Sequence, residues 1–136
     1  MPSKDAHLWQ AKHNETLFSQ LLTTEFLDWA VTAIFYSALH HVDAYLATKD
    51  IHPSFHYKGR DRWVATESNL RHIWNQYRWL KEKSEAARYD VKHFTQSEVN
   101  HLKQSEFEII KSHISKLKQG RFQSIKLLPG NPLEYP

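Results

Sequence analysis

Apolar side chains recur along most of this chain at intervals of three and four residues, the spacing of one face of an α-helix. In the segment 4–22 this face carries Leu8, Ala11, Phe18, Leu21 and Leu22. The segment 28–47 is apolar almost all round up to Leu39, so it is predicted to be the central and most buried helix. Its exception is a polar line, spaced i, i+3 and i+4, formed by Ser37, His40 and His41.

The second half of the chain repeats the helical pattern after a break. Pro53 and Gly59 indicate a loop over 50–60, and a short helix is expected from about residue 61 to 68. The next helix places on one face Leu70, Ile73, Tyr77, Leu80, Ser84 and Ala87. Because 18 residues make about five helical turns, Arg88 points the same way as Leu70. An arginine on the core side of a helix requires a partner, since an unpaired buried charge is very costly.

A capping box marks the start of the last helix. Thr95 and Glu98 have the spacing at which each side chain satisfies the other's backbone N–H. Gly120 is predicted to end this helix. Its apolar face comprises Val99, Leu102, Ile109, Ile110, Ile114 and Leu117. The expected fold is all-α: an up-and-down four-helix bundle with an additional short helix, forming one domain over 1–120 with an irregular tail over 121–136.

Composition and charge narrow the class of protein. The 136 residues fit one domain, and the absence of Cys excludes a disulfide scaffold, a thiolate metal site and a cysteine nucleophile. The N-terminus has no apolar run typical of a signal peptide, and the most apolar stretch contains His40, His41 and Asp43. We therefore expect a cytoplasmic protein without a membrane segment.

The net charge of +3 is unevenly distributed. Residues 1–50 contain three Lys and six acids, whereas residues 51–136 contain fifteen Lys and Arg and nine acids. The basic second half is compatible with a polyanionic partner, although charge alone favours ordinary solvated helix faces.

The segment from Arg88 to His93 contains an Arg and a His separated by four residues. Five other features of the chain accompany this motif: His13-Asn14, the run from Asp28 to His40, His52-Pro53, Ser84-Glu-Ala-Ala-Arg88-Tyr-Asp90 and the capped last helix. In these features the chain resembles the HEPN family, small helical bundles named for nucleotide binding in higher eukaryotes and prokaryotes. The resemblance implies a homodimer with two such motifs facing one cleft. It also implies an RNA or nucleotide partner, because many members are metal-independent ribonucleases with this Arg and His.

The chemistry of that motif suits RNA cleavage without a metal. His93 is the side chain able to exchange a proton with a ribose hydroxyl near neutral pH, and Arg88 can hold the phosphate bidentately. Asn14 or Glu15 is expected to orient Arg88. Asp90 is a further supporting residue, and Lys92 is expected to attract the RNA backbone. In the alternative interpretation, Arg88 and the adjacent tyrosine form a structural hydrogen-bonding corner with His93 on the surface.

A second group of polar residues lies in and near the predicted loop. His52, His56 and Arg60, together with His40, are assigned to substrate binding. In the alternative interpretation, the loop imidazoles fold against the polar line of the central helix in a structural or dimer-interface role, and metal binding is a third alternative.

Other classes of site lack their required residues. A di-metal carboxylate bundle needs Glu-x-x-His on two helices, and the segment 98–101 is the only such motif. With three Gly in the chain there is no Gly-rich phosphate loop. We therefore expect no metal and no cofactor.

The sequence leaves three hypotheses for function. The first is a HEPN-type ribonuclease of toxin or defence type, for which an antitoxin protein would be a further partner. The second is a catalytically silent HEPN module that binds a nucleotide or a protein. The third is a purely structural dimerisation protein.

Overall fold

The computed structural model describes the backbone of residues 1–53 and 57–127, and the side chains of 1–53 and 59–117. Every regular element in this part of the chain is helical, which confirms the all-α prediction. The elements are α1 (Lys4–Leu21), α2 (Leu27–Thr48), α3 (Tyr57–Thr66), the 3₁₀ turn η1 (Arg71–Ile73), α4 (Trp74–Tyr89), α5 (Gln96–Leu102), the π-helical turn η2 (Lys103–Phe107) and α6 (Glu108–Leu127).

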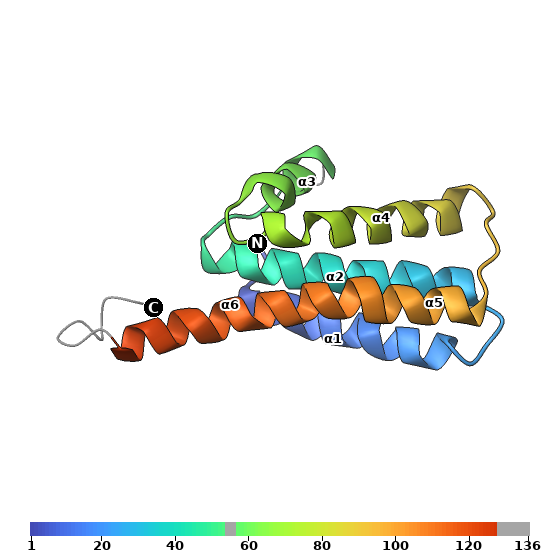
Figure 1. Ribbon diagram of the computed structural model, residues 1–136, viewed down its shortest axis with the longest axis horizontal. Coiled ribbons are helices and arrows are strands. Elements are labelled where there is room, and N and C mark those ends of the chain that lie inside the picture. Colours follow the sequence, from blue (N-terminus) through green and yellow to red (C-terminus); the bar gives the residue numbers. More distant parts are fainter. Residues whose placement is uncertain (54–56, 128–136) are drawn as a thin grey trace.

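Helix α2 lies in the middle of the molecule (Figure 1). It contacts α1, α4, α5 and α6, and the last two form one long rod with η2 between them. The turn from α1 to α2 and the turn from α4 to α5 lie at one end of the structure (Figure 1, right). The short helix α3 and the beginning of α1 lie toward the other end. The two ends therefore carry different sets of polar residues.

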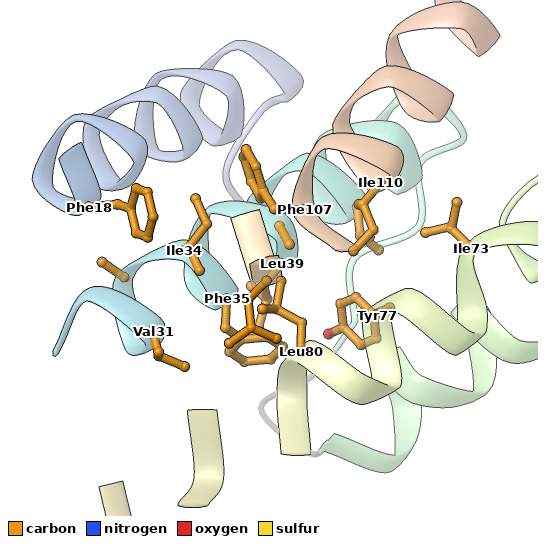
Figure 2. Packing of buried hydrophobic residues seen from close by; sticks show 14 of the residues in the cluster. Phe18, Val31, Ile34, Phe35, Leu39, Ile73, Tyr77, Leu80, Phe107 and Ile110 are labelled. Atoms are coloured by element: carbon orange, nitrogen blue, oxygen red, sulfur yellow. The ribbon is translucent and has the colours of Figure 1, made fainter. Parts of the chain in front are cut away.

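The core forms where the other helices meet α2. Phe18 of α1, Ile34 of α2, Leu80 of α4 and Phe107 of η2 are all enclosed in one cluster (Figure 2). Each fully buried side chain of this size contributes about 1.5–3 kcal/mol of hydrophobic stabilisation. The predicted burial of the apolar face over 70–87 is confirmed, since each of its six residues is buried. Leu70 and Ile73, however, precede α4, which begins at Trp74. None of the described helices is long and apolar enough to cross a membrane.

The helix starts are fixed by local hydrogen bonds. The Ser3 hydroxyl accepts from the backbone N–H of Ala6 at 3.1 Å and caps α1. The predicted capping box of α5 is present: the Thr95 hydroxyl accepts from the Glu98 N–H at 3.1 Å, and the Glu98 carboxylate accepts from the Thr95 N–H at 3.0 Å. This backbone hydrogen bond, helped by the nearby Lys92, lowers the pKa of Glu98.

The π-helical turn η2 changes which face of the last rod is buried. Uninterrupted α-helical spacing from Leu102 would place Glu106 and Ile109 toward the core. In the structure the buried series steps by five residues, from Leu102 to Phe107, and continues with two isoleucines: Ile110 and Ile114. The prediction that Ile109 belongs to the apolar face is therefore wrong, because the π turn adds one residue and rotates the face past it.

Two predicted element boundaries also differ. The last helix continues through Gly120 to Leu127, so the prediction that it ends at Gly120 is wrong. A helix tolerates an internal glycine at a cost of about 1 kcal/mol, and the next residue without a backbone N–H is Pro129. Helix α3 begins at Tyr57, four residues before the predicted start.

The π turn leads us to expect that two neighbouring positions differ in their contribution to stability. Phe107 is 0% exposed and Ile109 is 44% exposed. Phe107→Ala should therefore lower the free energy of unfolding by about 3–5 kcal/mol, whereas Ile109→Ala should cost less than about 1 kcal/mol. Urea unfolding followed by circular dichroism measures both. An equal or larger loss in Ile109→Ala would show that the rod has uninterrupted α-helical register.

Candidate functional site

The turn after α4 brings His93 back toward the helix it follows. The N–H of Asp90 donates to the carbonyl of Ala86 at 3.0 Å, and the N–H of Lys92 donates to the same carbonyl at 3.4 Å. Between them Val91 has φ = 53°, in the left-handed region. A β-branched residue is a genuine outlier there, because its Cβ is crowded by the backbone. The reversal of the chain at this point is thus held in a strained conformation.

Arg88 projects from the last turn of α4 toward the core, as its spacing predicts. Its Nη1 donates to the Ser84 hydroxyl at 3.0 Å, and its guanidinium carbon lies 5.4 Å from the ring centre of Tyr36 and 5.3 Å from that of Tyr89. Among the described residues, its Nε and Nη2 are buried and have no hydrogen-bond partner. Leaving buried donors unpaired is costly, more so when the group is charged. The guanidinium is therefore incompletely satisfied by the part of the chain that the structure describes.

Arg88 and His93 line the same open hollow, which has a volume of about 480 Å³. Lys92 adds a third basic group to its wall, and Glu25 and Asp28 add two carboxylates from the start of α2. The remaining wall is apolar and consists of Phe26, Leu27, Ala87, Val91 and Phe94. The structure thus brings together the two residues that the sequence assigned to catalysis.

The residues expected to support Arg88 have other contacts. Asn14 accepts a hydrogen bond from Gln10 at 2.9 Å. Glu15 forms ion pairs with two lysines of the last rod, Lys103 and Lys111. The described hydrogen bond of Arg88 goes to Ser84 instead, so neither Asn14 nor Glu15 orients it through a hydrogen bond recorded in this structure.

The other two predicted helpers of the motif lie at the edge of the site. Asp90 is exposed, ends α4 and is not part of the wall of the hollow. Lys92 lies in the wall but pairs with Glu98 at 3.2 Å and sits over the Phe94 ring at 4.7 Å. Lys92 therefore pairs with a residue of the α5 capping box and also lines the hollow.

The predicted substrate-binding residues of the loop form a different cluster. The Arg60 guanidinium donates to both oxygens of Asp43, at 2.8 and 3.0 Å. The Nδ1 atoms of His40 and His7 lie 3.0 Å apart, and His52 pairs with exposed Asp50 at 3.2 Å. His56 falls outside the described residues. The residues predicted to bind substrate therefore lie in two places: Lys92 is near Arg88, whereas His40, His52 and Arg60 are away from it.

Burial governs the protonation of the two facing imidazoles. It lowers the pKa of His7, and nearby Asp43 only partly opposes this effect. Burial likewise lowers the pKa of His40, which is lowered further by the charge of His7. Both rings therefore favour the neutral form, in which one Nδ1 can donate to the other.

The two clusters occupy opposite parts of α2. Asp28 in the wall of the hollow and His40 in the second cluster are twelve residues apart, which corresponds to about 18 Å along a helix. Sequence reasoning missed His7 and did not assign Asp43 to a site. Asp43 could have been found, because a carboxylate within the enclosed part of a mostly apolar helix requires a partner of opposite charge. His7 had no such signal.

Comparisons of the chain with protein-family models, with curated proteins and with solved structures found no match. What the hollow can do chemically therefore follows from its own residues: two cations and an imidazole beside two carboxylates. A guanidinium with spare donors favours an anionic ligand, and an exposed imidazole can transfer protons near neutral pH.

The strained turn between Arg88 and His93 makes a prediction about stability. Val91 is 78% exposed, so its replacement removes little packing. Val91→Gly should raise the free energy of unfolding by about 0.5–1 kcal/mol, because glycine relieves the left-handed strain but adds freedom to the unfolded chain. Asp50→Gly is the matched control: Asp50 also has positive φ, but Asp tolerates this region, so its gain should be smaller. A destabilised Val91→Gly variant would contradict a strained turn.

Proposed function

We propose that this protein is a HEPN-like four-helix bundle with α3 as the additional short helix, that it forms a homodimer, and that it binds RNA and cleaves it without a metal. The observation that carries the proposal is the pair Arg88 and His93 in the wall of one hollow, where two guanidinium nitrogens have no hydrogen-bond partner among the described side chains and backbone. A phosphate is the ligand that a fork of N–H donors fits best. The exposed ring of Tyr89 flanks the guanidinium, and its displacement would give the phosphate access.

The chemistry assigns one role to each residue. His93 accepts the proton of a ribose 2′-OH, and the oxygen attacks the neighbouring phosphorus. Arg88 binds the phosphate oxygens and stabilises the negative charge that develops on them. The bond from phosphorus to the 5′-oxygen breaks, and that oxygen leaves with a proton from a second imidazole. The products are a 2′,3′-cyclic phosphate and a 5′-hydroxyl.

A homodimer would supply the second imidazole as His93 of the other copy. Around the hollow the surface carries large exposed apolar side chains at Phe26, Trp29, Tyr89 and Val91. Phe26 and Val91 line the hollow, and Trp29 follows Phe26 by one helical turn. Exposed clusters of large apolar residues are typical of interaction surfaces. Pairing through this surface would place two hollows close together.

One observation favours the second candidate, a catalytically silent module that binds a nucleotide or a protein partner such as an antitoxin. Glu25 and Asp28 line the same hollow as Arg88 and Lys92, so the formal charges of these four groups cancel. Carboxylates repel the phosphates of a polyanion and attract basic groups of a protein. The ribonuclease cleaves RNA and the silent module does not, so a cleavage assay distinguishes the two functions.

The ribonuclease proposal predicts cleavage of a structured RNA in the presence of EDTA, with products ending in a 2′,3′-cyclic phosphate. His93→Ala and Arg88→Ala should each reduce the rate by about 10²–10⁴-fold, the range typical for loss of acid–base or charge-stabilising groups. His101→Ala and Arg78→Ala are matched controls, because both side chains are exposed and lie outside the hollow. Product ends are identified by their response to a phosphatase that removes cyclic phosphates.

Each result of that assay has a defined meaning. Cleavage that persists in the folded His93→Ala protein would refute His93 as the acid–base residue. RNA or nucleotide binding without cleavage would support the silent module. Far-ultraviolet circular dichroism of every variant shows whether a lost activity reflects chemistry or loss of the helical fold.

The dimer proposal predicts that one charge at the exposed apolar surface separates the two copies. Trp29 is 56% exposed, so Trp29→Glu should leave each copy folded while weakening the dimer by at least about tenfold, because burying an unpaired carboxylate in an interface is unfavourable. Trp79→Glu is the control, since Trp79 is 44% exposed on α4 beside Lys83 and outside this surface. Sedimentation velocity over a range of concentrations measures the association. A monomeric wild-type protein, or equal dissociation of both variants, would contradict the proposal.

A further inference from the structure

The cluster on the second half of α2 contains an arrangement that the proposed ribonuclease does not use. The Nδ1 atoms of His7 and His40 face one another at 3.0 Å across the interface of α1 and α2. Asp43 lies one helical turn after His40 and offers an oxygen to the same point, so that one ligand atom from each of the three residues lies within 4.8 Å of the others.

We propose that His7, His40 and Asp43 form a binding site for a divalent transition-metal ion such as Zn²⁺. A zinc ion binds imidazole nitrogens at about 2.0–2.1 Å in tetrahedral geometry, which sets two ligating nitrogens about 3.3–3.4 Å apart. The two Nδ1 atoms are already within a few tenths of an ångström of that separation. Two imidazoles and a carboxylate are a ligand set that zinc, nickel and cobalt accept, and three protein ligands leave a position for water.

Arg60 orients the third ligand. Its guanidinium holds both oxygens of Asp43, and the side chains of both residues are mostly buried, so the carboxylate cannot rotate freely. Each carboxylate oxygen has a second lone pair and can bind an ion while it accepts from Arg60. Hydrogen bonds of this kind are the usual support of a ligating carboxylate. The positive charge of Arg60 weakens the affinity of the site for a cation, and the negative charge of Asp43 offsets this effect.

The supporting scaffold is rigid where the ligands are attached. His40 and Asp43 belong to the same face of the most enclosed helix, and His7 lies in the second turn of α1, whose capped start is close by. A bound ion would join the beginning of α1 to α2. The site is about 18 Å from the hollow along α2, so this inference does not depend on the proposed ribonuclease.

The test is zinc binding by the full, untagged chain, measured by isothermal titration calorimetry after treatment with a chelator. The wild-type protein should bind one Zn²⁺ per chain. His7→Ala and His40→Ala should each weaken binding by at least about tenfold, because each removes one of three ligands. His72→Ala is the matched control: His72 and His113 form another close imidazole pair, but no carboxylate of a described residue completes it. This variant should bind as the wild type does.

A second readout keeps the test independent of the stability of the variants. Co²⁺ added to the wild-type protein should give the visible absorption of a four-coordinate cobalt site, and excess Zn²⁺ should abolish it. The melting temperature should rise with Zn²⁺ in the wild type and in His72→Ala, and stay unchanged in His7→Ala. Absence of binding by the wild type at 100 µM Zn²⁺, or equal binding by His7→Ala, would overturn the proposal and leave only a hydrogen-bonded imidazole pair.

Discussion

The enclosure of α2 is the constraint on which the rest of this structure depends. A helix covered on nearly every side must satisfy each of its polar side chains within the protein, because water does not reach them. Ser37 does so by donating to the carbonyl of Ala11 at 2.7 Å, His40 through His7, and Asp43 through Arg60. These contacts fix the rotation and the axial position of α1 and α3 around α2. The polar residues of the central helix therefore specify how its neighbours dock, and the apolar ones supply the stabilisation.

Arg88 departs from this rule of complete pairing. Arg60 is matched by both oxygens of a carboxylate. In the described part of the chain, Arg88 has one hydroxyl partner and two tyrosine rings, and two of its nitrogens have no hydrogen-bond partner. Proteins rarely leave such donors unsatisfied without a functional reason. The strained backbone of Val91 follows three residues later, so both unfavourable features lie between the last turn of α4 and the turn after it. At the opposite end of α2, by contrast, His40 is paired with His7, and Asp43 is paired with Arg60.

The sequence predicted those features that depend on local spacing, and missed those that depend on how helices pack. The buried face of α4 and the inward direction of Arg88 follow from helical periodicity, and the capping box follows from the spacing of Thr95 and Glu98. That His93 shares a hollow with Arg88 follows from a short connection. His7 and His40 are 33 positions apart in the chain, and their meeting depends on the relative rotation of α1 and α2, for which one sequence holds no signal. The contact of Glu15 with Lys111 is of the same kind, and it draws Glu15 toward α6.

The π turn between α5 and α6 has a consequence for how this chain should be aligned with others. One extra residue rotates the rest of a helix by about 100° about its axis. The apolar residues after η2 therefore face the core only because that residue is present. A homologous chain that lacks it would show a single-residue gap in the middle of a helix, where alignments normally allow none, and would still have the same interior. Searches that forbid gaps within helices would lose the match across the last quarter of the chain. Residues 103–107 are where such a gap belongs.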